Sequence, residues 1–211
     1  MLLDKYFIEE RLFVPIEKIP TQLINAFISA EDKNFYNHFG IDLFSILSAA
    51  IKNFTNLGSN KRLIGASTIT QQVVKNFLLS RELSLERKFK EMILAIRIEQ
   101  VLSKDRILEL YLNEIYLGYG SYGVAASSLN YFNKSLQELN LEEMAYLAAL
   151  PKAPNNYHPI KNYENAIGRR NWVLDQMFTN NYISKSDLEV KNKKLKVVKR
   201  DTILPIDAKY F

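Results

Sequence analysis

The sequence predicts a mainly α-helical protein with one folded domain and little β-structure. Three observations support this prediction. Apolar residues recur at helical spacing along most of the chain, residues that can cap a helix precede several of these segments, and stretches of apolar–polar alternation are short. A chain of 211 residues, of which 47% are hydrophobic, is long enough to bury one core.

The expected helices follow residues 6–19, whose weak alternation predicts a short strand or an extended lead-in. Helices are expected over residues 21–37, 41–54, 84–102, 104–117, 124–132, 141–150 and 165–178, and one more begins at Ser67 or Thr68. Thr21, Asp42 and Ser84 would cap three of them. A mobile loop is expected over residues 55–66, a turn over 118–123 and an irregular loop over 151–159.

The domain organisation has three parts. Residues 1–20 form the lead-in, residues 21–180 the folded domain, and residues 181–211 a charged tail whose lysines predict a solvated face.

The composition favours an anionic partner, because the net charge is +5 and the pI is about 9.2. Phosphate, nucleic acid and an anionic membrane surface all fit that charge. The absence of cysteine leaves the redox compartment open. The first residues do not form a signal peptide, and no run of 18 apolar residues could span a bilayer.

Two adjacent acids, Glu31 and Asp32, follow the apolar run of residues 23–30. A carboxylate at the edge of a core loses hydration, so its pKa tends to rise towards the range of a general base or acid. The spacing of His38 and Gly40 fits a helix that ends in a glycine cap. The alternative is an ordinary helix end with surface charges.

Two further polar segments follow. Residues 65–72 combine hydroxyls and amides at an expected helix start, with Lys75 one turn further on, which favours either an anion site or a capped surface helix. Glu91 lies four residues after Arg87 and three after Lys88. By itself this spacing indicates an ordinary helical salt bridge, worth roughly 0.3 kcal/mol.

Together these segments resemble glycosyltransferase family 51, the peptidoglycan transglycosylase domain of class A penicillin-binding proteins. Five motifs occur in the family's order: Glu31-Asp32-x-x-Phe35-x-x-His38-x-Gly40, the stretch from Gly65 to Gln72, Arg87-Lys88-x-x-Glu91, Lys104-x-x-Ile107-Leu108-Glu109-x-Tyr111-Leu112-Asn113, and Arg169-Arg170-x-x-Val173-Leu174. The resemblance covers roughly residues 7 to 195. It departs at Leu83, where some relatives carry an arginine, so a phosphate contact is not expected there.

The resemblance implies a lysozyme-like multi-helix fold with a large and a small lobe. It also implies polymerisation of lipid II into glycan strands, with inversion at C1 of N-acetylmuramic acid and release of undecaprenyl pyrophosphate. Glu31 would be the base and Glu91 the second catalytic carboxylate. The substrate-binding residues would be Asp32, Phe35, Ser67, Thr68, Gln71, Gln72, Lys75, Arg87, Lys88, Asn113 and Lys152.

The leaving pyrophosphate needs cations where negative charge develops, and Lys75, Arg87, Lys88 and Lys152 would supply them. Glu91 has three open roles: it could orient Arg87 and Lys88, hold a divalent cation, or stabilise the oxocarbenium-like centre. The sequence contains no metal-binding motif, and no cofactor is required. A divalent cation such as Mg²⁺ near the pyrophosphate is compatible with the resemblance.

The implied partners are lipid II, the nascent glycan strand, the membrane surface and other cell-wall synthesis proteins, with no nucleic acid. The segment 41–54 is apolar nearly all round, which predicts either a buried core helix or a patch that dips into the membrane. The implied location is the bacterial cytoplasmic membrane, with the catalytic domain on its outer, periplasmic face. The resemblance further leads us to expect an N-terminal anchor and a transpeptidase domain outside this chain.

Three other functions are less consistent with the sequence. A lysozyme-like wall hydrolase needs an acid to protonate the sugar oxygen rather than a pyrophosphate site, so the basic residues argue against it. A non-catalytic lipid-pyrophosphate binding module is less favoured because both Glu31 and Glu91 are present. Nucleic-acid binding is disfavoured because the positive charge is modest and densest in the C-terminal tail.

Overall fold

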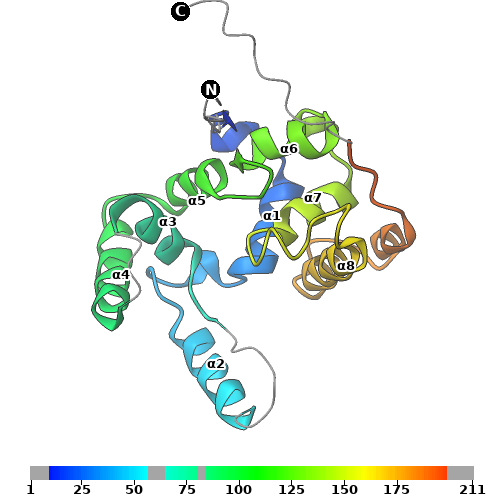
Figure 1. Ribbon diagram of the computed structural model, residues 1–211. Coiled ribbons are helices and arrows are strands. Elements are labelled where there is room, and N and C mark those ends of the chain that lie inside the picture. The colour runs from blue at the N-terminus through cyan, green and yellow to red at the C-terminus, as the bar shows by residue number, and fades with distance from the viewer. Residues whose placement is uncertain (1–9, 57–64, 80–83, 199–211) are drawn as a thin grey trace, which may run out of the picture.

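The computed structural model describes residues 10–56, 65–79 and 84–198 (Figure 1). Eight α-helices cover most of these residues: α1 (Thr21–Glu31), α2 (Leu43–Thr55), α3 (Ile69–Leu78), α4 (Leu85–Ile98), α5 (Lys104–Glu114), α6 (Val124–Phe132), α7 (Leu141–Ala149) and α8 (Tyr163–Thr179). Short 3₁₀ helices lie at η1 (Ile16–Lys18), η2 (Phe35–Asn37), η3 (Leu136–Glu138) and η4 (Ser186–Asn192). The described part of the chain is therefore mainly α, as predicted.

The β-structure is one pair of short strands. β1 (Glu10–Arg11) pairs in parallel with β2 (Ser121–Tyr122), with Glu10 opposite Ser121. The lead-in therefore contains the short strand that its sequence predicts, and that strand pairs with the turn between α5 and α6.

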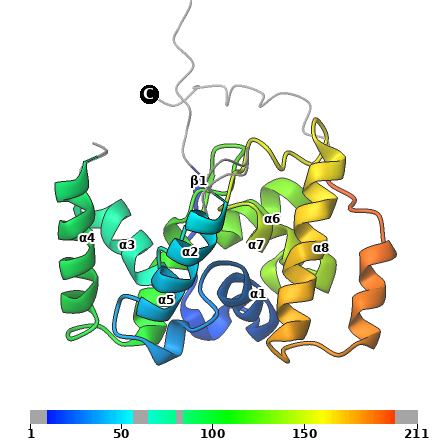
Figure 2. The same ribbon diagram turned by 90° about the horizontal axis from the view of Figure 1, so that it is seen from below.

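The core is built around α1, which packs against α7 and α8. Leu23 and Phe27 of α1 are completely buried, and every residue of α7 except the first is buried. The helix α5 joins this core to α3, and α3 packs in turn against α4. Both views place α3 and α4 on one side of α1 and α8 on the other (Figures 1 and 2).

Several helix starts follow the local capping rules. Asp42, Thr68 and Ser84 each accept a hydrogen bond from the backbone N–H three residues later, which satisfies a donor that the first turn leaves free. The prediction for Thr21 is wrong. It is the first residue of α1 rather than its cap, and Pro20 precedes it without a side-chain cap.

The first helix is also shorter than predicted, since α1 ends at Glu31 rather than at residue 37. Asp32 leaves the helix with non-helical backbone angles of φ −159° and ψ 74°, and its carboxylate accepts a 2.9 Å hydrogen bond from the N–H of Ile69. Gly40 does not cap a helix. It adopts a φ of +85°, and a Cβ atom there would lie 2.3 Å from the carbonyl oxygen of Ala95 on α4.

Helix α2 extends away from the other helices in Figure 1. Ala49 is its only buried residue, whereas Phe44 and Phe54 are 83% and 75% exposed. The alternative of a buried core helix is therefore wrong for residues 41–54. The loop expected over residues 55–66 falls largely on residues 57–64, which lie outside the described part.

The C-terminal tail is attached to the body rather than only solvated. Arg170 is completely buried on α8, and its guanidinium donates to the carbonyl oxygens of Lys191 and Lys193 at 2.8 and 2.9 Å. Leu195 of the same segment is buried as well. The tail therefore completes the core beside α7 and α8.

Candidate active site

Glu31 is the last residue of α1 and is partly buried. Its Oε2 accepts a 2.9 Å hydrogen bond from Nε2 of Gln72 on α3. Burial raises the pKa of the Glu31 carboxyl, and the negative charge of Asp32 adds to this effect. The Gln72 hydrogen bond and the charges of Arg169 and Lys152 oppose it. A partly buried carboxylate with a raised pKa can accept a proton from a hydroxyl.

Arg169 on α8, which the sequence prediction left without a role, interacts electrostatically with Glu31. Its guanidinium carbon lies 3.7 Å from the ring centre of Trp172, in a cation–π contact. Its Nε atom is buried and has no hydrogen-bond partner among the described residues. Burial lowers the pKa of Arg169, and the negative charge of Glu31 opposes that change. Only the family motif signalled this residue, because its link to Glu31 depends on the packing of α8 on α1.

A second cluster surrounds Glu91 on α4, which is only 2% exposed. The Lys88 ammonium forms an ion pair with its Oε1, and the Arg87 guanidinium lies 3.8 Å from its Oε2. Lys88 also donates a 3.0 Å hydrogen bond to the hydroxyl of Ser67. Here a buried acid fixes the positions of two cations.

Helix α3 connects the two clusters. Ser67 contacts Lys88 just before the helix begins, and Gln72 contacts Glu31 on its first turn. Both contacting residues therefore lie at the N-terminal end of α3, Ser67 just before its cap and Gln72 within the helix. Lys75 is exposed one turn after Gln71. The structure thus brings together Glu31 with Gln72, and Ser67 with Arg87, Lys88 and Glu91.

Three other predicted substrate-binding residues form structural hydrogen bonds. Asp32 accepts from the N–H of Ile69, and Thr68 donates to the carbonyl oxygen of Gly40 at 2.6 Å. Gln71 is 1% exposed and completes a capping box with Thr68. These residues hold the first turn of α3 in place, and a direct contact with substrate stays a prediction for them.

Phe35 and Asn113 also have structural positions. Phe35 is completely buried, with its ring 4.5 Å from the ammonium of Lys104. Asn113 pairs with the backbone of Val14, accepting from its N–H at 2.7 Å and donating to its carbonyl at 2.9 Å. Asn113 therefore ties the lead-in to α5, and its predicted substrate contact is untested.

Metal binding finds little support in this geometry. The described residues contain no group of three side chains suited to hold a metal ion. Glu91 is already paired with Lys88 and Arg87, so the residues present do not fit a cation held by that carboxylate. A Mg²⁺ ion near a pyrophosphate stays a prediction, and the pyrophosphate oxygens would have to be its main ligands.

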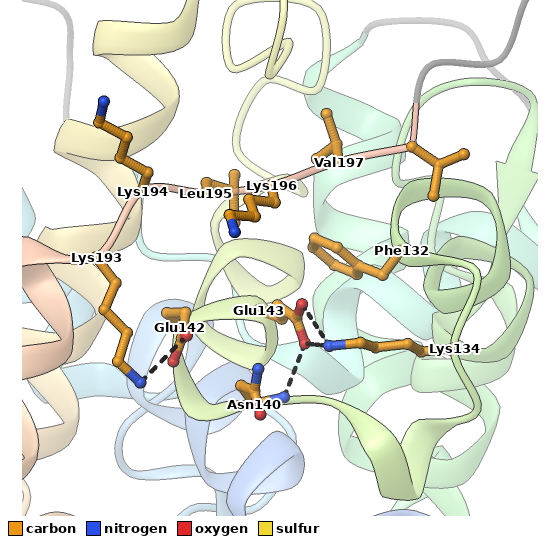
Figure 3. Close-up of a pocket in the computed structure, with 11 residues that line it drawn as sticks. Phe132, Lys134, Asn140, Glu142, Glu143, Lys193, Lys194, Leu195, Lys196 and Val197 are labelled. Carbon is orange, nitrogen blue, oxygen red and sulfur yellow. Dashed lines mark hydrogen bonds and ion pairs between the residues drawn. The ribbon is translucent and has the colours of Figure 1, made fainter.

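A cavity of about 700 Å³ lies elsewhere, between α6, α7 and the C-terminal segment (Figure 3). Its two acids are already engaged, Glu143 by Lys134 at 2.7 Å and Glu142 by Lys193 at 3.5 Å. None of the predicted site residues lines it. The candidate chemistry therefore belongs to the surface around Glu31 and Glu91.

Comparison with known proteins identifies the family. The family model described as transglycosylase matches residues 2–178. This chain belongs to the transglycosylase family. All the residues placed around Glu31 and Glu91 lie within the matched segment.

Similar transglycosylase proteins are named penicillin-binding protein 1A. The protein from Rickettsia typhi is 54% identical over 188 residues, which cover 89% of this chain and 24% of the relative. The Escherichia coli protein is 47% identical over 189 residues, which cover 89% and 22%. This chain therefore spans about a quarter of the length of the curated relatives it matches.

A solved relative supports the fold assignment. The crystal structure of penicillin-binding protein 1A from Haemophilus influenzae aligns with a TM-score of 0.53 and 28% identity, over 90% of this chain and 18% of that one. The mainly helical architecture of this transglycosylase matches that structure. Among the described residues, no helix has the length and apolar character needed to cross a bilayer.

Proposed function

We propose that this transglycosylase is a peptidoglycan glycosyltransferase that polymerises lipid II into glycan strands. The observation that carries the proposal is the partly buried Glu31 carboxylate. Burial raises its pKa, it accepts a hydrogen bond from Gln72, and the positive charges of Arg169 and Lys152 stabilise its ionised form. A base near cations suits attack by a neutral hydroxyl on a sugar that carries an anionic leaving group.

In the proposed reaction, the C4 hydroxyl of the acceptor N-acetylglucosamine attacks C1 of the donor N-acetylmuramic acid. Glu31 takes the proton of that hydroxyl as the new C1–O bond forms. The bond from C1 to the pyrophosphate oxygen breaks, and undecaprenyl pyrophosphate leaves with the electron pair. One displacement converts the α linkage into a β linkage, so no covalent glycosyl-enzyme is formed.

The pyrophosphate accumulates negative charge as it leaves, and the cluster around Glu91 can stabilise it. Arg87 and Lys88 are held on α4 by the buried Glu91 carboxylate, while Lys75 on α3 is exposed. Preorganised cations cost little reorganisation at the moment of reaction. Of the three roles left open for Glu91, its two ion pairs favour orientation of Arg87 and Lys88.

The same ion pairs argue against a wall hydrolase. A hydrolase of this type needs a protonated carboxyl group to donate to the leaving sugar oxygen. Glu91 instead forms ion pairs with the Lys88 ammonium and the Arg87 guanidinium. Such a hydrolase has no need of the cations that Glu91 holds, whereas a leaving pyrophosphate requires them.

Helix α2 supports contact with the membrane that carries a lipid-linked substrate. Leu43, Leu47 and Ile51 lie on one stripe at a spacing of four residues, and all are more than half exposed. We propose that this stripe enters the outer surface of the cytoplasmic membrane. Binding to anionic vesicles, measured by flotation, should weaken for Leu47→Ser. It should not weaken for Val101→Ser, because Val101 is an exposed apolar residue outside α2. Equal loss in both variants would contradict this role. Contacts with other cell-wall synthesis proteins stay a prediction.

Product analysis tests the proposed function. The 211-residue chain is incubated in detergent with fluorescent lipid II, or separately with preformed glycan strands. We expect glycan polymer and free undecaprenyl pyrophosphate from the first substrate, and no shortening of the second. Shortened strands without polymer would establish the hydrolase instead. Lipid II binding without either product would establish the binding module.

A further inference from the structure

We propose that Lys104 on α5 is a positioning residue for this reaction. Acting through His38 and Asp32, it fixes the first turn of α3 and thereby the amide of Gln72 that holds Glu31. The kinetic consequence rests on the proposed function, whereas the arrangement of protons described below does not.

The ammonium of Lys104 has three partners. It forms a 2.7 Å ion pair with Oε1 of Glu99, lies 3.5 Å from Nδ1 of His38, and sits 4.5 Å from the ring centre of Phe35. Its side chain is only 21% exposed. A carboxylate, an imidazole nitrogen and an aromatic face therefore hold this cation in one position.

The proton positions in His38 follow from these contacts. A lysine ammonium can only donate hydrogen bonds, so the Nδ1 atom that faces Lys104 must be the acceptor. The other nitrogen, Nε2, must then carry the proton, and it lies 3.0 and 3.1 Å from the two oxygens of Asp32. A doubly protonated imidazole would instead direct an N–H group at the ammonium. His38 is thus the link through which the position of Lys104 is coupled to Asp32.

Two acids linked to this lysine, Glu99 directly and Asp32 through His38, hold the start of α3. Asp32 accepts a 2.9 Å hydrogen bond from the N–H of Ile69, and Glu99 accepts a 2.5 Å bond from the hydroxyl of Thr70. Two consecutive residues of α3 are therefore bound to carboxylates that Lys104 connects. Removal of its charge leaves Glu99 without its cation and Nδ1 of His38 without a donor, which weakens the positions of both links to α3.

The functional consequence follows from the position of Gln72. It lies three residues after Ile69 on α3, and its amide donates to Glu31. A shift of the first turn would carry this amide away from the base. Small misplacements of catalytic groups cost up to about a hundredfold in rate. Replacement of Lys104 by Met should therefore lower kcat and leave KM nearly unchanged, because Lys104 has no predicted contact with substrate.

The experiment joins ¹⁵N NMR of the histidine side chains with steady-state kinetics. The chain has two histidines, so a His158→Gln variant assigns the His38 signals. We expect the Nε2–H tautomer in the wild type and a changed His38 spectrum in Lys104→Met. We also expect kcat to fall about tenfold or more in Lys104→Met, with KM within about twofold. Lys104→Arg should restore most of the rate, and Lys90→Met on the exposed face of α4 should match the wild type.

Two outcomes would overturn the proposal. A proton on Nδ1 of His38 in the wild type would contradict the proposed hydrogen bonds to Lys104 and Asp32. This test needs no variant, so it holds even if a substitution prevents folding. An unchanged kcat in folded Lys104→Met would contradict the positioning role. A wild type that binds lipid II without polymer would instead contradict the proposed function, and the NMR result would still test the contacts of His38.

Discussion

The side-chain amide of Gln72 on α3 donates a 2.9 Å hydrogen bond to Oε2 of Glu31 at the end of α1. This bond joins the two helices at the point where the proposed base is located. It also opposes the rise in the pKa of Glu31 that burial causes. Because the bond uses Oε2, we expect Oε1 to take the proton of the acceptor hydroxyl.

The charge of Arg169 should set the pH at which the enzyme loses activity in acid. Its positive charge lowers the pKa of Glu31, so Arg169→Met should raise that pKa. A base must be ionised to act, and the acid limb of the kcat/KM profile should therefore move to higher pH. The matched control is Lys185→Met, an exposed lysine beside η4. An acid limb that stays in place in Arg169→Met would show that this charge does not reach the base.

The raised pKa of Glu31 also predicts a cost in stability. Below the unfolded-state value of 4.5, the carboxyl is protonated in both states and its burial adds no electrostatic cost. As the pH rises through the higher folded-state pKa, the native state loses this relative stability. Glu31→Gln should therefore be more stable than the wild type at pH 7, by on the order of 1 kcal/mol. Urea unfolding at pH 4 and pH 7 measures the difference, which should shrink at pH 4. A variant less stable at pH 7 would contradict the assigned pKa direction.

The close approach of Gly40 to α4 predicts a strong effect of a single methyl group. A Cβ atom would lie 2.3 Å from the carbonyl oxygen and 2.8 Å from the next backbone nitrogen of α4, at a φ of +85°. Gly40→Ala should lower the free energy of unfolding by roughly 3 kcal/mol or more. Gly168→Ala is the matched control. It lies within α8 with open space around it, and should raise stability by about 0.5–1 kcal/mol. Similar unfolding midpoints for the two variants would refute the contact.

Much of the helical framework could be predicted because its causes are local. The caps at Asp42, Thr68 and Ser84 join atoms three residues apart, so the sequence contains both partners side by side. The end of α1 could not be predicted in this way. At that end Asp32 bonds to Ile69, which lies 37 residues away and meets it only after the helices pack.

In the candidate site, too, features with local causes could be predicted and those that depend on distant contacts could not. Glu31 could be found from its apolar lead-in and adjacent acid. The helical spacing of Arg87 and Glu91 predicted their ion pair, whereas their place in the site came from the family motif. The structural positions of Gln71 and Asn113 could not be predicted, because amides suit both a substrate and a backbone partner. For Asn113 that partner is Val14, 99 residues away.

The bonds of Asn113 to the lead-in predict a defect in stability rather than in catalysis. Asn113→Ala leaves the backbone N–H and carbonyl of Val14 without these partners, which should cost about 1–3 kcal/mol. Limited proteolysis should then cut the lead-in near Val14 faster than in the wild type. Below the unfolding temperature, kcat and KM should stay within about twofold. A large rise in KM without faster proteolysis would instead establish the substrate contact implied by the family motif.

The central claim is that Glu31 is the base of glycosyl transfer, and the most direct measurement is the initial rate of lipid II polymerisation by Glu31→Gln. Gln preserves the size of the side chain but cannot accept the proton, so the rate should fall by about 10²–10⁴-fold. The fold should remain intact by circular dichroism. Glu164→Gln, an exposed acid on the first turn of α8, should polymerise at the wild-type rate. Polymerisation by folded Glu31→Gln within a few-fold of the wild-type rate would contradict the account.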